Sequence, residues 1–320
     1  MGLREFTVGK NDAGQRLDRF ISKTFRDLPA SLMYKAIRRK DIRVNGKRAE
    51  VSQILTEGDA VRVYLPEDAI GARDPGLEKS RLSHVTPAFS VVYEDENLLI
   101  VNQPSGLSCH ADAHNDVNNL TSQLRAYLMK KGEYSPEDER SFSPSLCNRI
   151  DRNTSGLVIA AKNAAALREA DRVIRERLVT KKYLLAAHGE MPERSGRLVG
   201  YIKKDADRST VKVGSAPFPG GREAVTQYRV ISVSGGLSLV EATLLTGRTH
   251  QIRAQFSASG HPLLGDGKYG KNGDDRRLGF GSQALVSYYL RFDAEDGLLS
   301  YLRGKEFTVP PEEIDFLKLF

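Results

Sequence analysis

The stretch Asn148-Arg149-Ile150-Asp151-Arg152-Asn153-Thr154-Ser155-Gly156-Leu157-Val158 lies near the middle of the 320-residue chain. Its one carboxylate, Asp151, stands between two arginines, and a Thr-Ser-Gly turn leads from it into an apolar run that ends at Ala161. The run is long enough for a buried strand. A carboxylate beside cations stays ionised and can be held in one direction. On these residues alone, Asp151 can act as a nucleophile, act as a base, or simply brace the turn.

The segments around this run predict strands and helices in no regular alternation. Apolar or alternating residues predict strands at 90–93, 98–101, 183–188, 226–232 and 237–245. The segment 163–178, rich in Ala, Arg and Glu, predicts a helix. Because no βαβ regularity appears, the expected fold class is α+β, with helices packed on an extended mixed or antiparallel sheet.

The composition indicates an intracellular globular protein of two domains. A hydrophobic fraction of 40% is sufficient for ordinary cores. No run approaches the ~18 apolar residues of a membrane span, and the N-terminus lacks the apolar core of a signal peptide. The two cysteines, Cys109 and Cys147, form no CxxC pair or disulfide framework. We therefore expect a cytoplasmic protein with no membrane partner.

Most of the net charge of +7 lies in the first fifth of the chain. Residues 14–65 contain 12 Lys and Arg against 6 Asp and Glu. The same segment predicts two helices, a hairpin turn at Asn45-Gly46 and a strand at 61–65. Concentrated positive charge is typical of a polyanion binder, although charge alone is equally compatible with a solvated surface.

Residues 14–65 resemble the small RNA-binding domain of the S-four type, named for ribosomal small-subunit protein four. The matching pieces are the Arg-Leu-Asp opening at residue 16, Arg43-Val44-Asn45-Gly46-Lys47 and Gly58-Asp59. The resemblance implies a small α/β domain that binds structured RNA. Its expected phosphate contacts are Lys35, Arg38, Arg39, Lys40 and Arg43. Residues 66–88, with scattered Pro, Gly and charge, are expected to be a linker.

Residues 89–320 are expected to form one catalytic domain, because four segments in it resemble the RluA-type pseudouridine synthases. That family modifies ribosomal and transfer RNA. In chain order, the segments are Val101-Asn102-Gln103-Pro104-Ser105-Gly106-Leu107, Arg149 to Leu157, Lys181-Lys182-Tyr183-Leu184-Leu185-Ala186, and Gly247-Arg248-Thr249-His250-Gln251-Ile252-Arg253 followed by Gly260 to Asp266.

The resemblance implies a role for each matching residue. Asp151 is the essential carboxylate at the anomeric carbon, and Arg253 is its ion-pair partner. Tyr183 stacks on the base, Ile252 is an apolar contact of the base, and Arg149 occupies the place of the flipped nucleotide in the RNA helix. Pseudouridine formation involves no redox change and no external group, so no cofactor and no metal are expected.

The chain departs from the family pattern at two positions. The usual His before the signature Arg is Asn148, which hydrogen-bonds but carries no charge near neutral pH. The usual Lys of the first segment is Gln103, an exchange that removes a cation and is able to alter RNA contact. Near the last segment, the spacing of His250, His261 and Asp266 is not that of a metal site, so we expect a structural hydrogen bond at His250.

The expected function is the isomerisation of specific uridines in structured RNA to pseudouridine by a monomer. The attached RNA-binding domain favours a large structured target, and the resemblance to the family implies large-subunit ribosomal RNA, with transfer RNA as an open alternative. A second hypothesis is a non-catalytic RNA-binding or ribosome-assembly factor on a degenerate synthase scaffold. A third, a metal- or His-dependent nuclease, lacks a supporting cluster of ligands.

Overall fold

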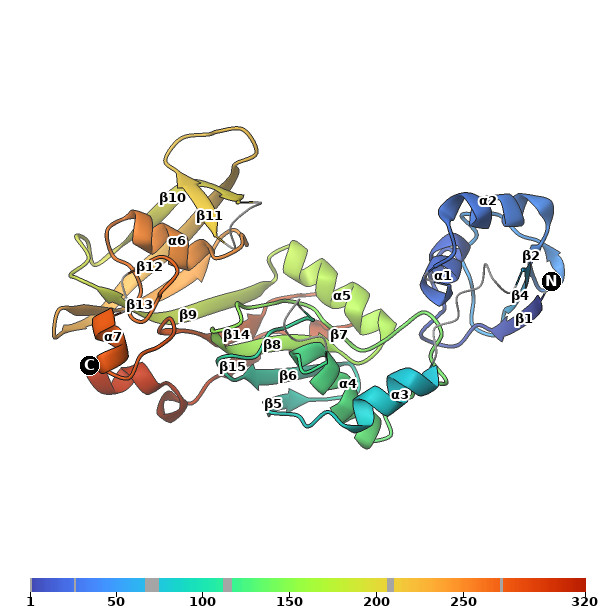
Figure 1. Ribbon diagram of the computed structural model, residues 1–320, viewed down its shortest axis with the longest axis horizontal. Coiled ribbons are helices and arrows are strands. Elements are labelled where there is room, and N and C mark those ends of the chain that lie inside the picture. Colours follow the sequence, from blue (N-terminus) through green and yellow to red (C-terminus); the bar gives the residue numbers. More distant parts are fainter. Residues whose placement is uncertain (1, 26, 67–74, 112–116, 206–209, 271–272) are drawn as a thin grey trace.

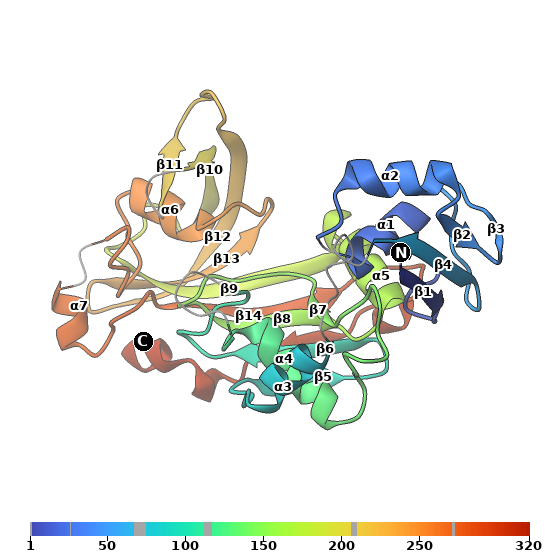
Figure 2. The ribbon, with the colours of Figure 1, turned by 45° about the vertical axis from the view of Figure 1, so that its right-hand side comes forward.

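The computed structural model describes residues 2–25, 27–66, 75–111, 117–205, 210–270 and 273–320 (Figure 1). A small N-terminal unit lies beside a larger unit that is built on one long sheet. Figures 1 and 2 both place the small unit near helix α5 (Ala164–Arg175), at the end of the molecule away from α6 (Gln251–Ala258) and α7 (Gly273–Arg277).

The small unit packs two helices on a four-stranded sheet of order β1-β4-β2-β3. Leu17, Phe20 and Ile21 are spaced to share one face of the first helix, and all three are fully buried. The predicted range 14–65 omits the first strand, which pairs with β4 along its whole length. The elements are β1 (Gly2–Thr7), α1 (Leu17–Thr24), α2 (Ala30–Arg39), β2 (Ile42–Val44), β3 (Lys47–Arg48) and β4 (Ala60–Leu65).

The segment expected to be a linker contains a helix, α3 (Pro75–Ser83), which packs on α4 (Leu120–Lys130). Residues 67–74 of that segment lie outside the described residues. Leu82 is the buried apolar anchor of α3. A helix that is held mainly by one such residue shows no apolar periodicity, so its sequence looks like a linker.

The larger unit contains an 11-stranded sheet. Strands β14 and β8 run parallel, and the other pairs among the described residues are antiparallel, so the sheet is mixed. The fold is therefore α+β, as the sequence predicts. In spatial order the strands are β11 (Val211–Gly214), β10 (Ser195–Lys204), β12 (Arg222–Ser234), β13 (Leu237–Leu244), β9 (Val179–His188), β14 (Leu285–Phe292), β8 (Ser155–Ala161), β6 (Leu98–Gln103) and β5 (Ser90–Glu94), with β15 (Glu306–Thr308) on β14 and β7 (Ser145–Leu146) on β8.

Two hydrophobic cores cover the two faces of this sheet. Leu157 and Ile159 point into the core that contains α5, whereas Val158 and Ala160 point into the core that contains α4 and α6. Strand β8 is thus buried on both faces, which explains its continuous apolar run. Three short 3-10 helices lie in the C-terminal segment, at Ser300–Leu302, Pro311–Glu313 and Asp315–Leu319. Among the described residues, no helix is long and apolar enough to cross a lipid bilayer.

One row of paired residues crosses the middle of the sheet. Gly156 of β8 lies opposite Gln103 on one side and Ser287 on the other, and Ser287 lies opposite Tyr183 of β9. Gly156 has φ +114°, and a Cβ there would overlap the backbone of Ser287. Only glycine allows β8 and β14 to approach this closely. The row sets the position of Tyr183 relative to the turn that precedes β8.

Hydrogen bonds join the small unit to the larger one. Asp12, only 3% exposed, accepts hydrogen bonds at Oδ1 from the backbone N–H of Ser141 at 3.0 Å and from its hydroxyl at 2.5 Å. Asn11 accepts at Oδ1 from the backbone N–H of Ala164, the first residue of α5, at 3.1 Å. Because these N–H groups need partners, the contacts fix the small unit against Ser141 and against the start of α5.

Candidate active site

Asp151 lies in a tight turn between β7 and β8, and a second loop supports that turn. The carbonyl of Asp151 accepts a hydrogen bond from the N–H of Thr154 at 2.9 Å. The N–H of Gly106 donates to the carbonyl of Arg152 at 2.9 Å, and the hydroxyl of Ser105 donates to the carbonyl of Asn153 at 3.0 Å. The first and second sequence segments therefore meet, and the first one braces the turn that carries Asp151.

Gln103 is fully buried within this support. Its Nε2 donates to the carbonyl of Leu107 at 2.8 Å, and its Oε1 accepts from the thiol of Cys109 at 3.2 Å. The Gln103 side chain has no exposed surface, so its contacts lie within the support of the turn. Asn148 also has a structural contact, since its Oδ1 accepts from the backbone N–H of Ile159 on β8 at 2.8 Å.

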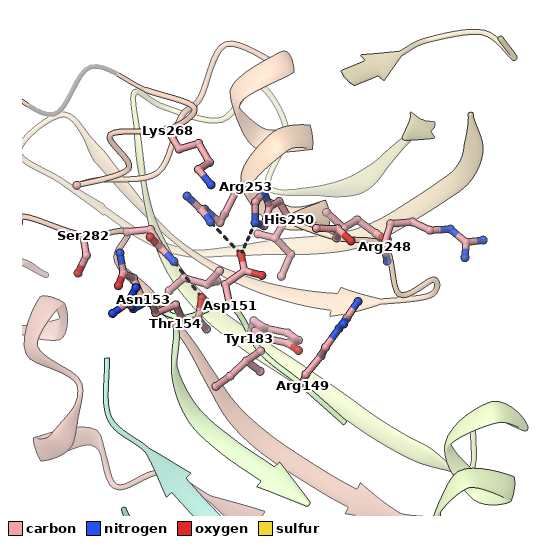
Figure 3. Close-up of a pocket in the computed structure, with 18 of the residues that line it drawn as sticks. Arg149, Asp151, Asn153, Thr154, Tyr183, Arg248, His250, Arg253, Lys268 and Ser282 are labelled. Carbon is pink, nitrogen blue, oxygen red and sulfur yellow. Dashed lines mark hydrogen bonds and ion pairs between the residues drawn. The ribbon is translucent and has the colours of Figure 1, made fainter. Parts of the chain in front are cut away.

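Arg253 of α6 holds two carboxylates at once, those of Asp151 and Asp266; Figure 3 shows its contact with Asp151. Its Nη1 donates to Asp151 Oδ2 at 2.9 Å, while Nε and Nη2 donate to the two oxygens of Asp266 at 2.7 and 2.9 Å. The side chains of Arg253 and Asp266 are 7% and 0% exposed, and that of Asp151 is 26% exposed. The buried two-pronged contact with Asp266 directs Nη1 toward the partly exposed carboxylate of Asp151.

The pKa shifts of this group follow from burial and charge together. Burial alone would raise the pKa of Asp266, but hydrogen bonds and charge from Arg253, with the N–H groups of Lys268 and Tyr269, lower it overall. Burial alone would lower the pKa of Arg253, but Asp266 and Asp151 raise it overall. Arg253 and Asp266 are therefore a permanently charged pair under Asp151.

Tyr183 of β9 lies on the other side of Asp151 from Arg253 (Figure 3). Its side chain is 6% exposed, and burial raises its pKa to about 12. The ring therefore offers a neutral phenol near neutral pH. Ile252, at the start of α6 and 4% exposed, lines the same cavity. Arg149 is exposed at the open side of that cavity.

These residues line one cavity of about 910 Å³. Among its described lining residues, Asp151 is the one carboxylate, and it is surrounded by cations. Such a cavity attracts a polyanion and places it beside this single carboxylate. The cations are Arg149, Arg152, Lys181, Lys204, Arg248, Arg253, Lys268 and Arg276.

Three residues near Asp151, namely His250, Asp266 and Tyr269, were not assigned a role in the site from the sequence. His250 hydrogen-bonds through Nδ1 to the hydroxyl of Tyr269 at 2.7 Å, and its Nε2 lies 4.0 Å from Asp151 Oδ2. The expected hydrogen bond at His250 is present, but the side chain also faces the carboxylate. Asp266 ends the last sequence segment and Tyr269 follows it closely, and that proximity was the available signal for both.

The five cations expected to contact RNA are all exposed, and they lie in the small unit, whose helix α2 is far from α6 in Figure 2. Three belong to α2 and two lie just after it. Arg43 donates from Nε to the carbonyl of Lys40 at 3.0 Å, and its guanidinium lies 5.7 Å from the centre of the Tyr64 ring. The set consists of Lys35, Arg38, Arg39, Lys40 and Arg43.

Known proteins share both units of this chain. The RNA pseudouridylate synthase family matches residues 97–258, and the S4 domain family matches residues 15–61. A ribosomal large subunit pseudouridine synthase C from Vibrio vulnificus is 34% identical over 85% of this chain and 80% of its own length. An uncharacterized RNA pseudouridine synthase from Mycoplasma capricolum is 31% identical over 98% of this chain and 99% of its own length.

A solved structure agrees with these matches. Human RNA pseudouridylate synthase domain containing 1 superposes with a TM-score of 0.54 at 27% identity, covering 69% of this chain and 83% of its own. The family match, the sequence similarity over most of the chain and the shared fold agree with one another. The chain therefore belongs to the RNA pseudouridylate synthase family, whose members isomerise uridine in RNA.

Proposed function

We propose that this synthase modifies uridines of large-subunit ribosomal RNA, with Asp151 as its essential carboxylate. The observation that carries the proposal is the 2.9 Å ion pair of Asp151 with Arg253 in a cavity that is otherwise cationic. The names of the Vibrio relatives support the choice of RNA. The proposed site of action is the cytoplasm, and the proposed active form is a monomer.

The reaction requires one carboxylate at the sugar. The bond from uracil N1 to C1′ breaks, the base turns, and a bond forms from C5 to C1′. C5 then loses its proton and N1 gains one, so no atom is added overall. Asp151 acts at the anomeric centre as a nucleophile or a base, and Arg253 keeps the carboxylate pointing at the sugar.

The target uridine must leave the RNA stack first, at a cost of a few kcal/mol. Contact of a base with an aromatic ring contributes about 1–3 kcal/mol. Tyr183 is proposed to supply this contact, and Ile252 to pack against the base. Arg149, exposed at the open side, is proposed to fill the vacated place in the helix.

A non-catalytic assembly factor on a degenerate scaffold is the weaker proposal. Such a scaffold has no physical need to retain Asp151, Arg253 and Tyr183 around one cavity. A buried cation that orients a single carboxylate has a clear use in catalysis, whereas RNA binding alone would be opposed by that negative charge.

Release of tritium from RNA that carries [5-³H]uridine tests the proposal, because C5 loses its proton. With an unmodified large-subunit ribosomal RNA transcript, the wild type should release tritium. Asp151→Asn should release less than a hundredth as much while binding RNA within a few-fold. Asp171→Asn, which alters a carboxylate of α5 outside the cavity, is the control. Asp151→Asn turnover at a tenth of wild type would exclude an essential role. Release from transfer RNA alone would overturn the substrate but not the chemistry.

A further inference from the structure

His250 and Tyr269 form a hydrogen-bonded pair directly behind Asp151. His250 Nδ1 lies 2.7 Å from the Tyr269 hydroxyl, and the two rings meet edge to face with centroids 5.6 Å apart. On the opposite edge of the imidazole, Nε2 faces Asp151 Oδ2, the same oxygen that Arg253 contacts. Asp151 is thus approached by two side chains that share one support.

The backbone of His250 turns this side chain toward the cavity. Its φ is 52°, in the left-handed region, and it immediately precedes α6. Few non-glycine residues adopt this conformation, and those that do tend to cluster at functional sites. An ordinary helix start at this position would not place the imidazole between Tyr269 and Asp151.

The hydrogen bonds of Tyr269 select one tautomer of His250. The backbone N–H of Val211, on β11, donates to the Tyr269 oxygen at 2.9 Å. The phenol hydrogen remains available for His250 Nδ1. If Nδ1 carried the proton instead, the neutral ring would present its Nε2 lone pair to a carboxylate. The favoured arrangement is therefore Tyr269 O–H donating to Nδ1, with Nε2–H facing Asp151.

Tyr269 also supports the second side chain that reaches Asp151. Its ring centre lies 5.2 Å from the Arg253 guanidinium carbon. A cation over a ring face is held by the ring quadrupole, which adds to the fork with Asp266. One tyrosine therefore contacts both the imidazole and the guanidinium that converge on Asp151.

We propose that His250 and Tyr269 are positioning residues for pseudouridine formation: Tyr269 locks His250 as the Nε2–H tautomer, and this N–H orients Asp151 together with Arg253. At 4.0 Å in the free enzyme the contact is long. Such contacts commonly tighten when substrate fills the site. The inference rests on the proposed role of Asp151.

The surroundings of His250 keep it neutral near neutral pH. Burial lowers its pKa, and Arg253 and Lys268 lower it further, while Asp151 and Asp266 act in the opposite direction. The remaining neighbour, Tyr269, stays a phenol because burial raises its pKa to about 12. In acid, the protonated ring would place a second cation against Asp151 and would have to donate Nδ1–H to Tyr269. Both changes should weaken catalysis.

Substitutions of His250 separate orientation from simple packing. His250→Ala removes the donor and should lower kcat about 10- to 100-fold, with the KM for RNA unchanged. His250→Gln keeps an N–H at the position of Nε2 and cannot be protonated there. We expect it to restore kcat to within about threefold of wild type at pH 8. Its kcat should also fall less than that of wild type in acid, at pH values below the ordinary histidine pKa of about 6.5.

Removal of a single hydroxyl tests the role of Tyr269. Tyr269→Phe keeps the ring under Arg253 but frees the tautomer of His250, so kcat should fall about tenfold with little change in KM. Tyr288→Phe is the matched control, because it removes a phenol hydroxyl bonded to Glu241 outside the cavity. Unfolding midpoints of both variants show whether a loss of activity reflects lost folding.

Asp151→Asn in the same assay distinguishes the possible failures. If Asp151→Asn is active, the proposed catalytic carboxylate is wrong. If Asp151→Asn is inactive but His250→Ala keeps the kcat and the pH profile of wild type, only the positioning proposal is overturned. A Tyr269→Phe variant with the kcat of Tyr288→Phe would also overturn it.

Discussion

Arg253 contacts Asp151 through one nitrogen, Nη1, and contacts Asp266 through its other two, Nε and Nη2. The Asp266 side chain is fully buried, whereas that of Asp151 keeps 26% of its surface open to the cavity. The same guanidinium therefore neutralises the buried charge of Asp266 and orients the partly exposed carboxylate of Asp151. Substitutions at its two partners should have different consequences for folding and for catalysis.

Arg253→Ala should be costly for both stability and turnover. It leaves Asp266 buried without its cation, which should reduce the free energy of unfolding by about 3–5 kcal/mol. Asp151→Asn, which affects a partly open side chain, should change stability by less than about 1 kcal/mol. Chemical denaturation of both variants, with tritium release measured in parallel, checks the difference.

Arg253→Lys keeps the charge but cannot form a fork and reach Asp151 at the same time. It should therefore recover stability better than turnover. If Arg253→Ala is as stable and as active as wild type, the guanidinium does not organise the site.

Tyr183→Phe should keep turnover within a few-fold because the ring remains, whereas Tyr183→Ala should weaken the interaction with the base by about 1–3 kcal/mol.

The phenol of Tyr183 also predicts how the stability of the fold changes in alkali. Burial raises the pKa of Tyr183 to about 12. Between pH 10 and 12 the unfolded chain loses this proton and the folded chain keeps it, so stability falls as pH rises. Tyr183→Phe should remove that part of the fall, which denaturation at pH 9 and pH 11 can measure.

The basic face of α2 should determine how RNA binding responds to salt. Replacing Lys35, Arg38 and Arg39 with alanine should weaken binding. It should also reduce the slope of log affinity against log salt by about 0.7–0.9 for each phosphate that the protein no longer neutralises. Alanine at Arg175, Arg303 and Lys318, in the larger unit, provides a control of equal charge. Filter binding from 50 to 200 mM salt should separate the two sets, and equal slopes would mean that α2 does not touch RNA.

Gly156→Ala should damage the middle of the sheet. A methyl group there would approach the backbone nitrogen of Ser287 to 2.7 Å, at a φ of +114°. We expect a loss of more than about 2 kcal/mol from overpacking and backbone strain together. Gly132→Ala is the matched control, because φ there is +75° with no atom within 4 Å of an added Cβ. A similar loss at both positions would mean that only the backbone angle matters.

Several strands of the larger unit were predictable because their side-chain patterns are local, whereas β10, β11 and the central strand β14 were not predicted. The apolar run 157–161 becomes β8, and the runs at 98–101 and 237–245 become β6 and β13. Strand β1 was not found because Arg4 and Glu5 interrupt its alternation, and it is held by pairing with the distant β4. Strand pairing depends on residues far away in the sequence, which a local pattern does not record.

The site was predictable in its members but not in its arrangement. The resemblance pointed to Asp151, Tyr183 and Arg253, which line one cavity. The sharing of Arg253 with Asp266, and the contact of Tyr269 with His250, arise from the packing of α6 against the loop that follows it. Neither pairing has a characteristic spacing in the sequence.

The hydrogen bonds of Asn11 to Ala164, at the start of α5, and of Asp12 to Ser141 have a consequence for substrate choice. They hold the small unit, which carries the basic helix α2, at a fixed position relative to the Asp151 cavity. If α2 binds RNA as proposed, a uridine reacts only when its distance from the RNA bound to α2 matches the distance from α2 to the Asp151 cavity, whatever bases surround it. The folded shape of the RNA would then determine which uridine is modified.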